Sequence, residues 1–110
     1  MRKEYSNGDI YEGDFINDYR TGHGKYFYAN GDFYEGDFVS DKRTGRGTFV
    51  WKNGDVYEGE FLNGKCSGNG KLTAFDGEVS EGIWKDGNIV EYSAGSRSSR
   101  RKMLNTPDDE

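Results

Sequence analysis

The chain has little of what a conventional globular core or a disulfide-bonded scaffold requires. Only 32% of its 110 residues are hydrophobic, and Cys66 is the single cysteine. One cysteine excludes an internal disulfide and agrees with a reducing compartment. The longest apolar run is a few residues, too short to span a membrane, and no apolar stretch of a signal peptide follows Met1. We therefore expect a single cytoplasmic domain.

Glycine and aromatic residues are abundant instead. The sequence contains 17 glycines, and aromatic residues make up 15% of it. Disordered chains are depleted in aromatic residues, so this composition argues against disorder. It predicts a thin structure in which flat rings cover the backbone that glycine leaves bare.

A repeat of 23 residues runs through most of the chain, and such internal repeats decide the fold class. The positions that recur at this spacing are Gly8, Gly31, Gly54 and Gly77; Glu12, Glu35, Glu58 and Glu81; Gly13, Gly36, Gly59 and Gly82; and Phe15, Phe38, Phe61 and Trp84. They divide residues 1–92 into a half unit (1–10), three complete units (11–33, 34–56 and 57–79) and a degenerate half unit (80–92). In the degenerate unit, Ser80 replaces the tyrosine that opens each complete unit.

Each unit is predicted to form a β-hairpin. Asn-Gly followed by Asp, as in Asn30-Gly31-Asp32, favours a tight type I′ turn, because Asn and Gly adopt positive φ at low cost. The other connection, residues 17–22 in the first unit, is longer and polar, and the strands lie near 9–16 and 24–29. Hairpins joined by hairpins predict an all-β fold, a single antiparallel meander sheet.

Side-chain alternation places most aromatic residues on one face of this sheet. Tyr11, Gly13 and Phe15 share a face, and each such glycine leaves a slot for a ring from the neighbouring strand. The rings then either line an accessible groove, because a single layer cannot bury both of its faces, or pack on one another. The groove would consist of Tyr11, Phe15, Tyr26, Tyr28, Tyr34, Phe38, Phe49 and Trp51.

Three copies of a short motif resemble the MORN repeat (membrane occupation and recognition nexus). They are Tyr11-Glu12-Gly13-Asp14-Phe15, Tyr34-Glu35-Gly36-Asp37-Phe38 and Tyr57-Glu58-Gly59-Glu60-Phe61, each followed by Gly-x-Gly. The resemblance covers residues 1–92 and implies an elongated, twisted single sheet with a groove on one face. It does not select an activity, because the family includes cytoskeletal scaffolds, membrane-junction proteins, axonemal components, and accessory regions of lipid kinases and methyltransferases.

Residues that could carry out catalysis do not come together in this arrangement. Cys66 and His23 are the only candidates for a nucleophile and its base, and they lie two repeats apart, roughly 19 Å across four strands. A hydrogen-bonded dyad is therefore excluded. Cys66 shares its repeat position with Arg20 and Arg43, which we expect in an exposed loop. The repeated glutamates of the Glu12 series indicate a structural role, and we expect no enzyme activity.

A metal site is not expected either. Asp9, Asp32, Asp55 and Glu78 share one repeat position. Neighbouring members should lie about 10 Å apart, too far to share a cation that needs ligands at about 2.4 Å. We interpret these residues as turn and strand-end residues, and we expect no cofactor.

Charge is distributed unevenly along the chain. Residues 1–92 carry 11 Lys and Arg against 17 Asp and Glu, a net charge of −6, which disfavours binding to nucleic acid. The long connections nevertheless predict a basic rim, opposite acidic turns that hold Asp9, Asp32 and Asp55. The rim would consist of Arg20, His23, Lys42, Arg43, Arg46 and Lys65.

The Ser- and Arg-rich tail, residues 93–110, breaks the repeat. We expect it to be disordered or to form a short capping helix near 100–105. As a basic docking segment, it could be neutralised by phosphorylation of its serines.

These observations leave three hypotheses for function. We favour a non-enzymatic protein-binding scaffold or adaptor that holds a peptide or helix in the aromatic groove and dimerises through a sheet edge. The first alternative is peripheral association with anionic phospholipid through the basic rim and tail. The second is an accessory or regulatory module of a larger enzyme. All three agree with a cytoplasmic protein associated with the cytoskeleton or a membrane.

Overall fold

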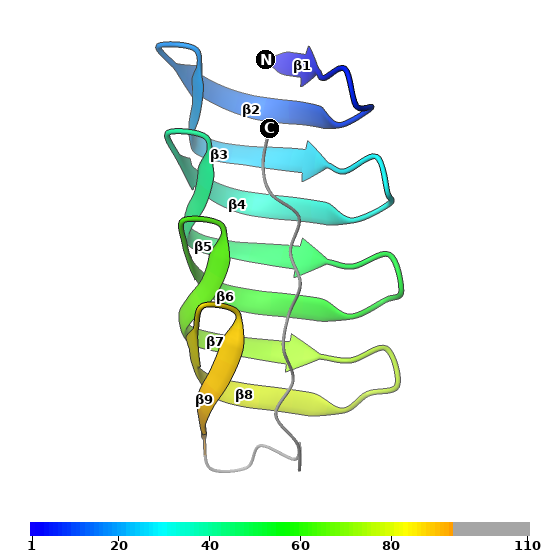
Figure 1. The fold of residues 1–110 in the computed structure, drawn as a ribbon, viewed down its shortest axis with the longest axis vertical. Helices are drawn as coiled ribbons and strands as arrows, with labels where there is room; N and C mark the ends of the chain where they lie inside the picture. Colours follow the sequence, from blue (N-terminus) through cyan, green and yellow to red (C-terminus); the bar gives the residue numbers. More distant parts are fainter. Residues whose placement is uncertain (94–110) are drawn as a thin grey trace.

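One sheet of nine strands makes up the residues that the computed structural model describes, 1–93. The strands are β1 (Arg2–Glu4), β2 (Ile10–Ile16), β3 (Tyr19–Phe27), β4 (Phe33–Val39), β5 (Lys42–Val50), β6 (Val56–Leu62), β7 (Lys65–Thr73), β8 (Val79–Lys85) and β9 (Asn88–Tyr92). Each strand pairs antiparallel with the next one in the chain, so the sheet is an open meander (Figure 1). The predicted all-β meander is therefore confirmed. The predictions for the tail beyond Ser93 lie outside the described residues.

Two kinds of connection alternate along the sheet, and their assignment from the sequence was wrong. The tight two-residue turns lie at 17–18, 40–41, 63–64 and 86–87, where both central residues have positive φ, as a type I′ turn requires. In the first of them, Asn17 and Asp18 have φ of 52° and 68°. Because β3 begins directly after this turn, at Tyr19, the expected polar loop at 17–22 is mostly strand.

The Asn-Gly segments form the wider connections instead. Gly31 N–H donates to the Tyr28 carbonyl at 3.0 Å, and Tyr28 N–H donates to the Asp32 carbonyl at 3.0 Å. Only Gly31 has positive φ in this loop, at 102°, which matches a three-residue loop with a glycine bulge. The Asn30 side chain accepts a bond from Asp32 N–H at 2.9 Å, so the asparagine favours the loop through its side chain.

A tyrosine ring lies over a pair of glycines in each complete unit. Tyr34 on β4 covers Gly36 and Gly47, and its hydroxyl donates to the Asp37 carbonyl at 2.8 Å. A Cβ added at Gly47 would lie only 2.5 Å from a carbon atom of the Tyr34 ring. Tyr11 over Gly24 and Tyr57 over Gly70 repeat this contact, which confirms the slot predicted for a neighbouring ring.

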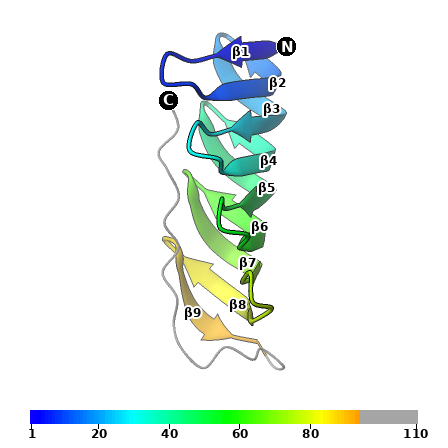
Figure 2. The ribbon, with the colours of Figure 1, turned by 90° about the vertical axis from the view of Figure 1, so that its right-hand side faces the viewer.

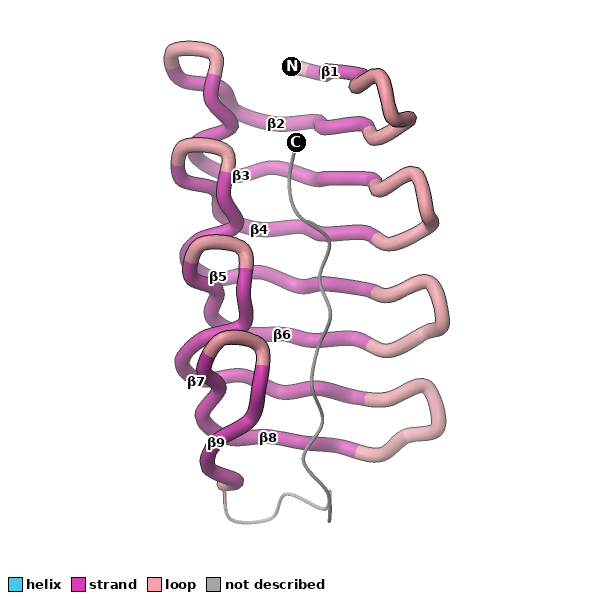
Figure 3. Tube along the Cα trace, in the orientation of Figure 1, coloured by secondary structure: helices cyan, strands magenta, loops and turns pink. Residues whose placement is uncertain are grey.

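A β-bulge at the same place bends each hairpin. The β2–β3 register shifts between Gly13 and Phe15, and Asp14 accepts a bond from the His23 N–H of the bulged strand at 3.2 Å. Asp37 and Glu60 do the same for the next two hairpins. Because bulges bend and twist a strand, the hairpin tips curl over one face of the sheet (Figures 2 and 3). We call this side the inner face and the opposite side the outer face.

Aspartates at the starts of the repeats join one unit to the next. Asp9 accepts bonds from Tyr26 Oη at 2.8 Å and from Ala29 N–H at 2.7 Å. Asp32 and Asp55 bond the equivalent backbone N–H groups one repeat later, at 2.8 and 2.9 Å. Three of the four carboxylates that form a ladder in the sequence, Asp9, Asp32 and Asp55, are thus buried links between units, each bonded to a loop of the next unit.

Gly47→Ala tests the slot. The added methyl group cannot fit beside the buried Tyr34 ring, so we expect the free energy of unfolding to fall by about 1–3 kcal/mol, as in other overpacked cores. Urea denaturation measures it. Thr48→Ala, one residue along on the outer face, is the control and should cost less than about 1 kcal/mol. Equal losses for both variants would contradict the slot.

Candidate functional site

The expected aromatic groove is filled by its own rings. Six of its eight residues are buried: Tyr11, Tyr26, Tyr28, Tyr34, Phe38 and Phe49. Each ring packs against rings of its own and the neighbouring unit; the Tyr34 ring, for example, lies 5.2 Å from Phe38 and 5.1 Å from Phe61, edge to face. Burial raises the pKa of the Tyr11 hydroxyl to about 12. Only Phe15 and Trp51 remain partly exposed, so the groove expected as an open surface is corrected to a core.

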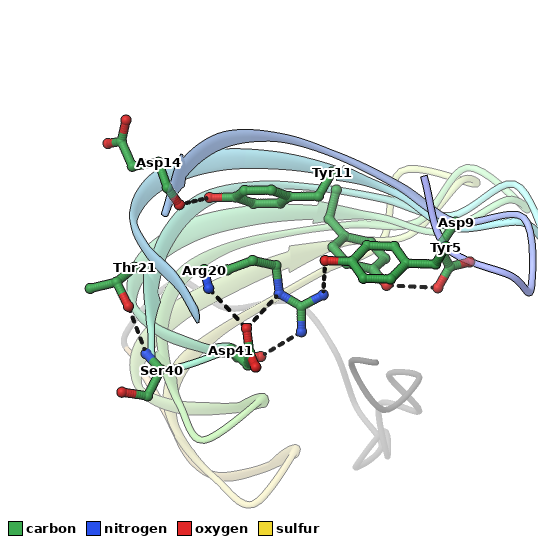
Figure 4. A network of polar contacts seen from close by, with 9 residues as sticks. Tyr5, Asp9, Tyr11, Asp14, Arg20, Thr21, Ser40 and Asp41 are labelled. Carbon is green, nitrogen blue, oxygen red and sulfur yellow. Dashed lines mark hydrogen bonds and ion pairs between the residues drawn. The ribbon is translucent and has the colours of Figure 1, made fainter. Parts of the chain in front are cut away.

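Arg20 is also part of this core, although we expected it on an exposed basic rim. Its guanidinium is fully buried, donating to Tyr5 Oη at 2.9 Å and to the Asp41 carbonyl at 3.0 Å (Figure 4). Nε lies 3.4 Å from the Asp41 carboxylate, and the group stacks over the Tyr26 ring at 5.0 Å. The buried cation is stabilised because the next hairpin tip and four aromatic rings surround it.

Arg43 repeats this arrangement one unit later. It donates to Tyr28 Oη and to the Gly64 carbonyl, and it lies over the Phe49 ring at 5.3 Å. A signal for this burial exists in the sequence. Tyr5 and Tyr28 precede Arg20 and Arg43 by 15 residues. In the third unit, the tyrosine becomes Trp51 and the arginine becomes Cys66.

The remaining residues of the expected rim do not form one surface. His23 and Arg46 lie on the outer face next to acidic residues of the following unit: His23 Nε2 is 3.6 Å from Glu35, and Arg46 Nη1 is 3.9 Å from Glu60. Lys42 and Lys65 are exposed at the hairpin tips. The structure therefore separates the six residues of the expected rim into two that are buried, two on the outer face beside carboxylates and two at the hairpin tips.

Cys66 is buried within β7, and its expected place in an exposed loop was wrong. Burial raises the pKa of its thiol to about 12, so the reactive thiolate is scarce at neutral pH. Its side chain belongs to the inner core, whereas His23 lies on the outer face four strands away. The two residues have no geometry for a catalytic dyad.

Two further findings concern the described part of the chain. Residues 1–93 contain no group of three or more His, Cys, Asp or Glu side chains that could hold a metal ion. Nor do they form a helix long and apolar enough to cross a membrane.

The outer face carries a feature that the sequence reasoning missed: an apolar row that crosses seven strands. Side chains paired from strand to strand line up as Ile10, Phe27, Phe33, Val50, Val56, Thr73 and Val79. Most are half-buried, and Phe27 is 38% exposed. A signal was available, because each member recurs as an apolar residue or threonine at the 23-residue spacing. We call this set the outer apolar row.

An acidic belt lies beside the outer apolar row. Between the row and the hairpin tips, the outer face of β2–β8 carries seven acidic side chains: Glu12, Asp14, Glu35, Asp37, Glu58, Glu60 and Glu81. The cations of this belt are Lys25, Arg46 and Lys71. Arg2 on β1 adds a fourth cation, since its Nε lies 3.8 Å from Glu12. With seven acidic residues against these four cations, the net charge is −3, so the belt attracts basic partners.

Arg43→Lys tests the buried arginine network. Lysine keeps the charge, but a single ammonium group cannot reach both Tyr28 Oη and the Gly64 carbonyl. We expect the free energy of unfolding to fall by about 2–4 kcal/mol, measured by chemical denaturation. Arg46→Lys on the exposed outer face is the control and should change it by less than about 0.5 kcal/mol. A small effect of Arg43→Lys would show that the network contributes little.

Comparison with known proteins agrees with this architecture. A family model described as the MORN repeat matches three times, at residues 11–33, 34–56 and 57–79, with the same boundaries as the complete units. A search of curated proteins finds no match. MORN repeats are commonly protein- or membrane-binding modules and are generally non-enzymatic. The matches span more than half of the sequence, and this chain therefore belongs to the MORN repeat family.

Proposed function

We propose that this chain is a non-enzymatic protein-binding scaffold that holds its partner on the outer face of the sheet. The observation that carries the proposal is the outer apolar row, which crosses seven strands and has Thr73 as its one polar member. A contiguous apolar surface on a folded protein commonly marks an interaction site. The inner face offers a partner less accessible apolar surface, because its rings are already packed on one another.

The partly exposed Phe15 and Trp51 are the part of the original groove hypothesis that remains. They lie on β2 and directly after β5, separated by buried residues, and so give a partner two isolated contacts. The outer apolar row offers continuous contact instead. Pairing of an edge strand, β1 or β9, with a second copy of the chain stays a prediction. The packing of the inner and outer faces does not test it.

Association with anionic phospholipid is the second candidate function, and the charge distribution of the described residues disfavours it. Two of the six proposed rim residues, Arg20 and Arg43, are buried. The acidic belt on the outer face would repel an anionic bilayer. A role as an accessory module of a larger enzyme is compatible with the scaffold proposal, since such a module also acts by binding.

Affinity capture from cell lysate with matched variants tests the proposal. Val50→Lys places a charge at the middle of the row, and Val39→Lys makes the same change at a hairpin tip where the valine is 51% exposed. We expect the intact chain and Val39→Lys to retain the same proteins, and folded Val50→Lys to lose them. Retention by Val50→Lys, or recovery of lipid without protein, would contradict the proposal. Circular dichroism of each variant establishes that it is folded.

A further inference from the structure

We infer that the outer face binds an amphipathic helix that lies across the strands and carries basic residues along one side. This inference rests on the proposed function and names the kind of partner. The spacing of the outer apolar row, its length and the charge of the belt beside it all favour such a partner.

The spacing of the row matches a helix better than an extended peptide. One side chain of the row comes from each strand, and neighbouring strands lie about 4.8 Å apart. The apolar seam of a heptad helix offers one residue per roughly 5.2 Å, because 3.5 residues rise about 1.5 Å each. An extended peptide offers one same-face side chain only every ~6.8 Å. A helix therefore stays in step over the row, whereas an extended peptide falls out of step within two or three strands.

The length of the row is also that of an ordinary helix. The row crosses from β2 to β8, and six strand spacings are about 29 Å. A helix of about 19 residues spans this distance. Over that length, the mismatch between the two spacings accumulates to only about 2–3 Å, which side-chain rotation absorbs.

The acidic belt sets the charge of the partner. Glu12, Glu35, Glu58 and Glu81 border the row at one per repeat, two residues along from row members of their own strands. Two strand spacings separate successive glutamates, roughly 9.6 Å, close to the ~10.5 Å rise of a heptad. One lysine or arginine per heptad, on the side of the helix facing the belt, would meet one glutamate per repeat.

The centre of the belt is the place where no lysine lies between two successive glutamates of the series. Lys25 on β3 lies between Glu12 and Glu35, and Lys71 on β7 lies between Glu58 and Glu81, but β5 places Thr48 between Glu35 and Glu58. The cation of β5, Arg46, lies nearer the hairpin tips, with its Nη1 3.9 Å from Glu60. The row members nearest this point are Phe33, Val50 and Val56. We therefore place the strongest contact of the helix at β4–β6. The same acidic surface would repel the outer face of a second copy.

Two synthetic peptides probe this site. Both are 21-residue helices with leucine at the seam positions; one carries lysine and the other glutamate at the flanking positions. Each is titrated into the full ¹⁵N-labelled chain and followed by NMR. We expect the lysine peptide to shift amide signals on the outer face of β4–β6. The glutamate peptide should bind at least about tenfold more weakly, because like charges then face one another.

Charge reversal on the protein is the matched test. Glu58→Lys should weaken binding of the lysine peptide by about tenfold and strengthen binding of the glutamate peptide. Glu91→Lys, the same change on β9 away from the row, should alter neither. Equal binding of the two peptides, no binding of either, or shifts confined to Phe15 and Trp51 would overturn the inference. If Val50→Lys still loses its captured proteins in that case, the scaffold proposal stands and only the helical, basic partner is wrong.

Discussion

The contact on which the rest of this structure depends is a tyrosine ring lying flat over two glycines of paired strands. Tyr34 over Gly36 and Gly47 shows why both residue types are needed. Any Cβ at the glycine would occupy the place of the ring, and a smaller side chain would leave the strand backbone uncovered. The ring forms a layer of side chains above the backbone of the inner face. Phe38 and Phe61 pack edge to face against this ring. A single sheet thereby acquires a core without a second layer.

Polar groups then join the units that the rings fill. Asp9 bonds a loop one repeat away, and Arg20 bonds both Tyr5 and the following hairpin tip at Asp41. In a larger protein, buried polar groups are tolerated; in this thin sheet, they provide contacts between repeats that apolar burial alone would supply weakly. Filling the inner face in this way leaves the outer face as the continuous apolar surface, and our functional proposal follows from that division.

The strands, and the face of the sheet on which the aromatic rings lie, were predictable from the sequence. Glycine and tyrosine recur every 23 residues, and only one alignment of the repeats accounts for both. The turn types were not predictable, because Asn-Gly suits both a type I′ turn and a glycine-bulge loop, and the choice depends on the partner strand. Burial of Arg20 and Arg43 was missed because arginine is ordinarily exposed. Its burial here depends on a tyrosine 15 residues earlier. The outer apolar row was missed because each strand contributes only one member, so the row becomes continuous only when the strands are placed side by side.

The most direct test of this account is an NMR measurement with a soluble paramagnetic agent, which broadens signals of exposed groups. The account predicts strong broadening of methyl signals from the outer apolar row, Val50 and Val56 among them. The ring signals of Tyr34 and Tyr57, buried on the inner face, should stay sharp. Broadening of those rings together with protected valine methyls would contradict it, because the inner face would then be the open surface.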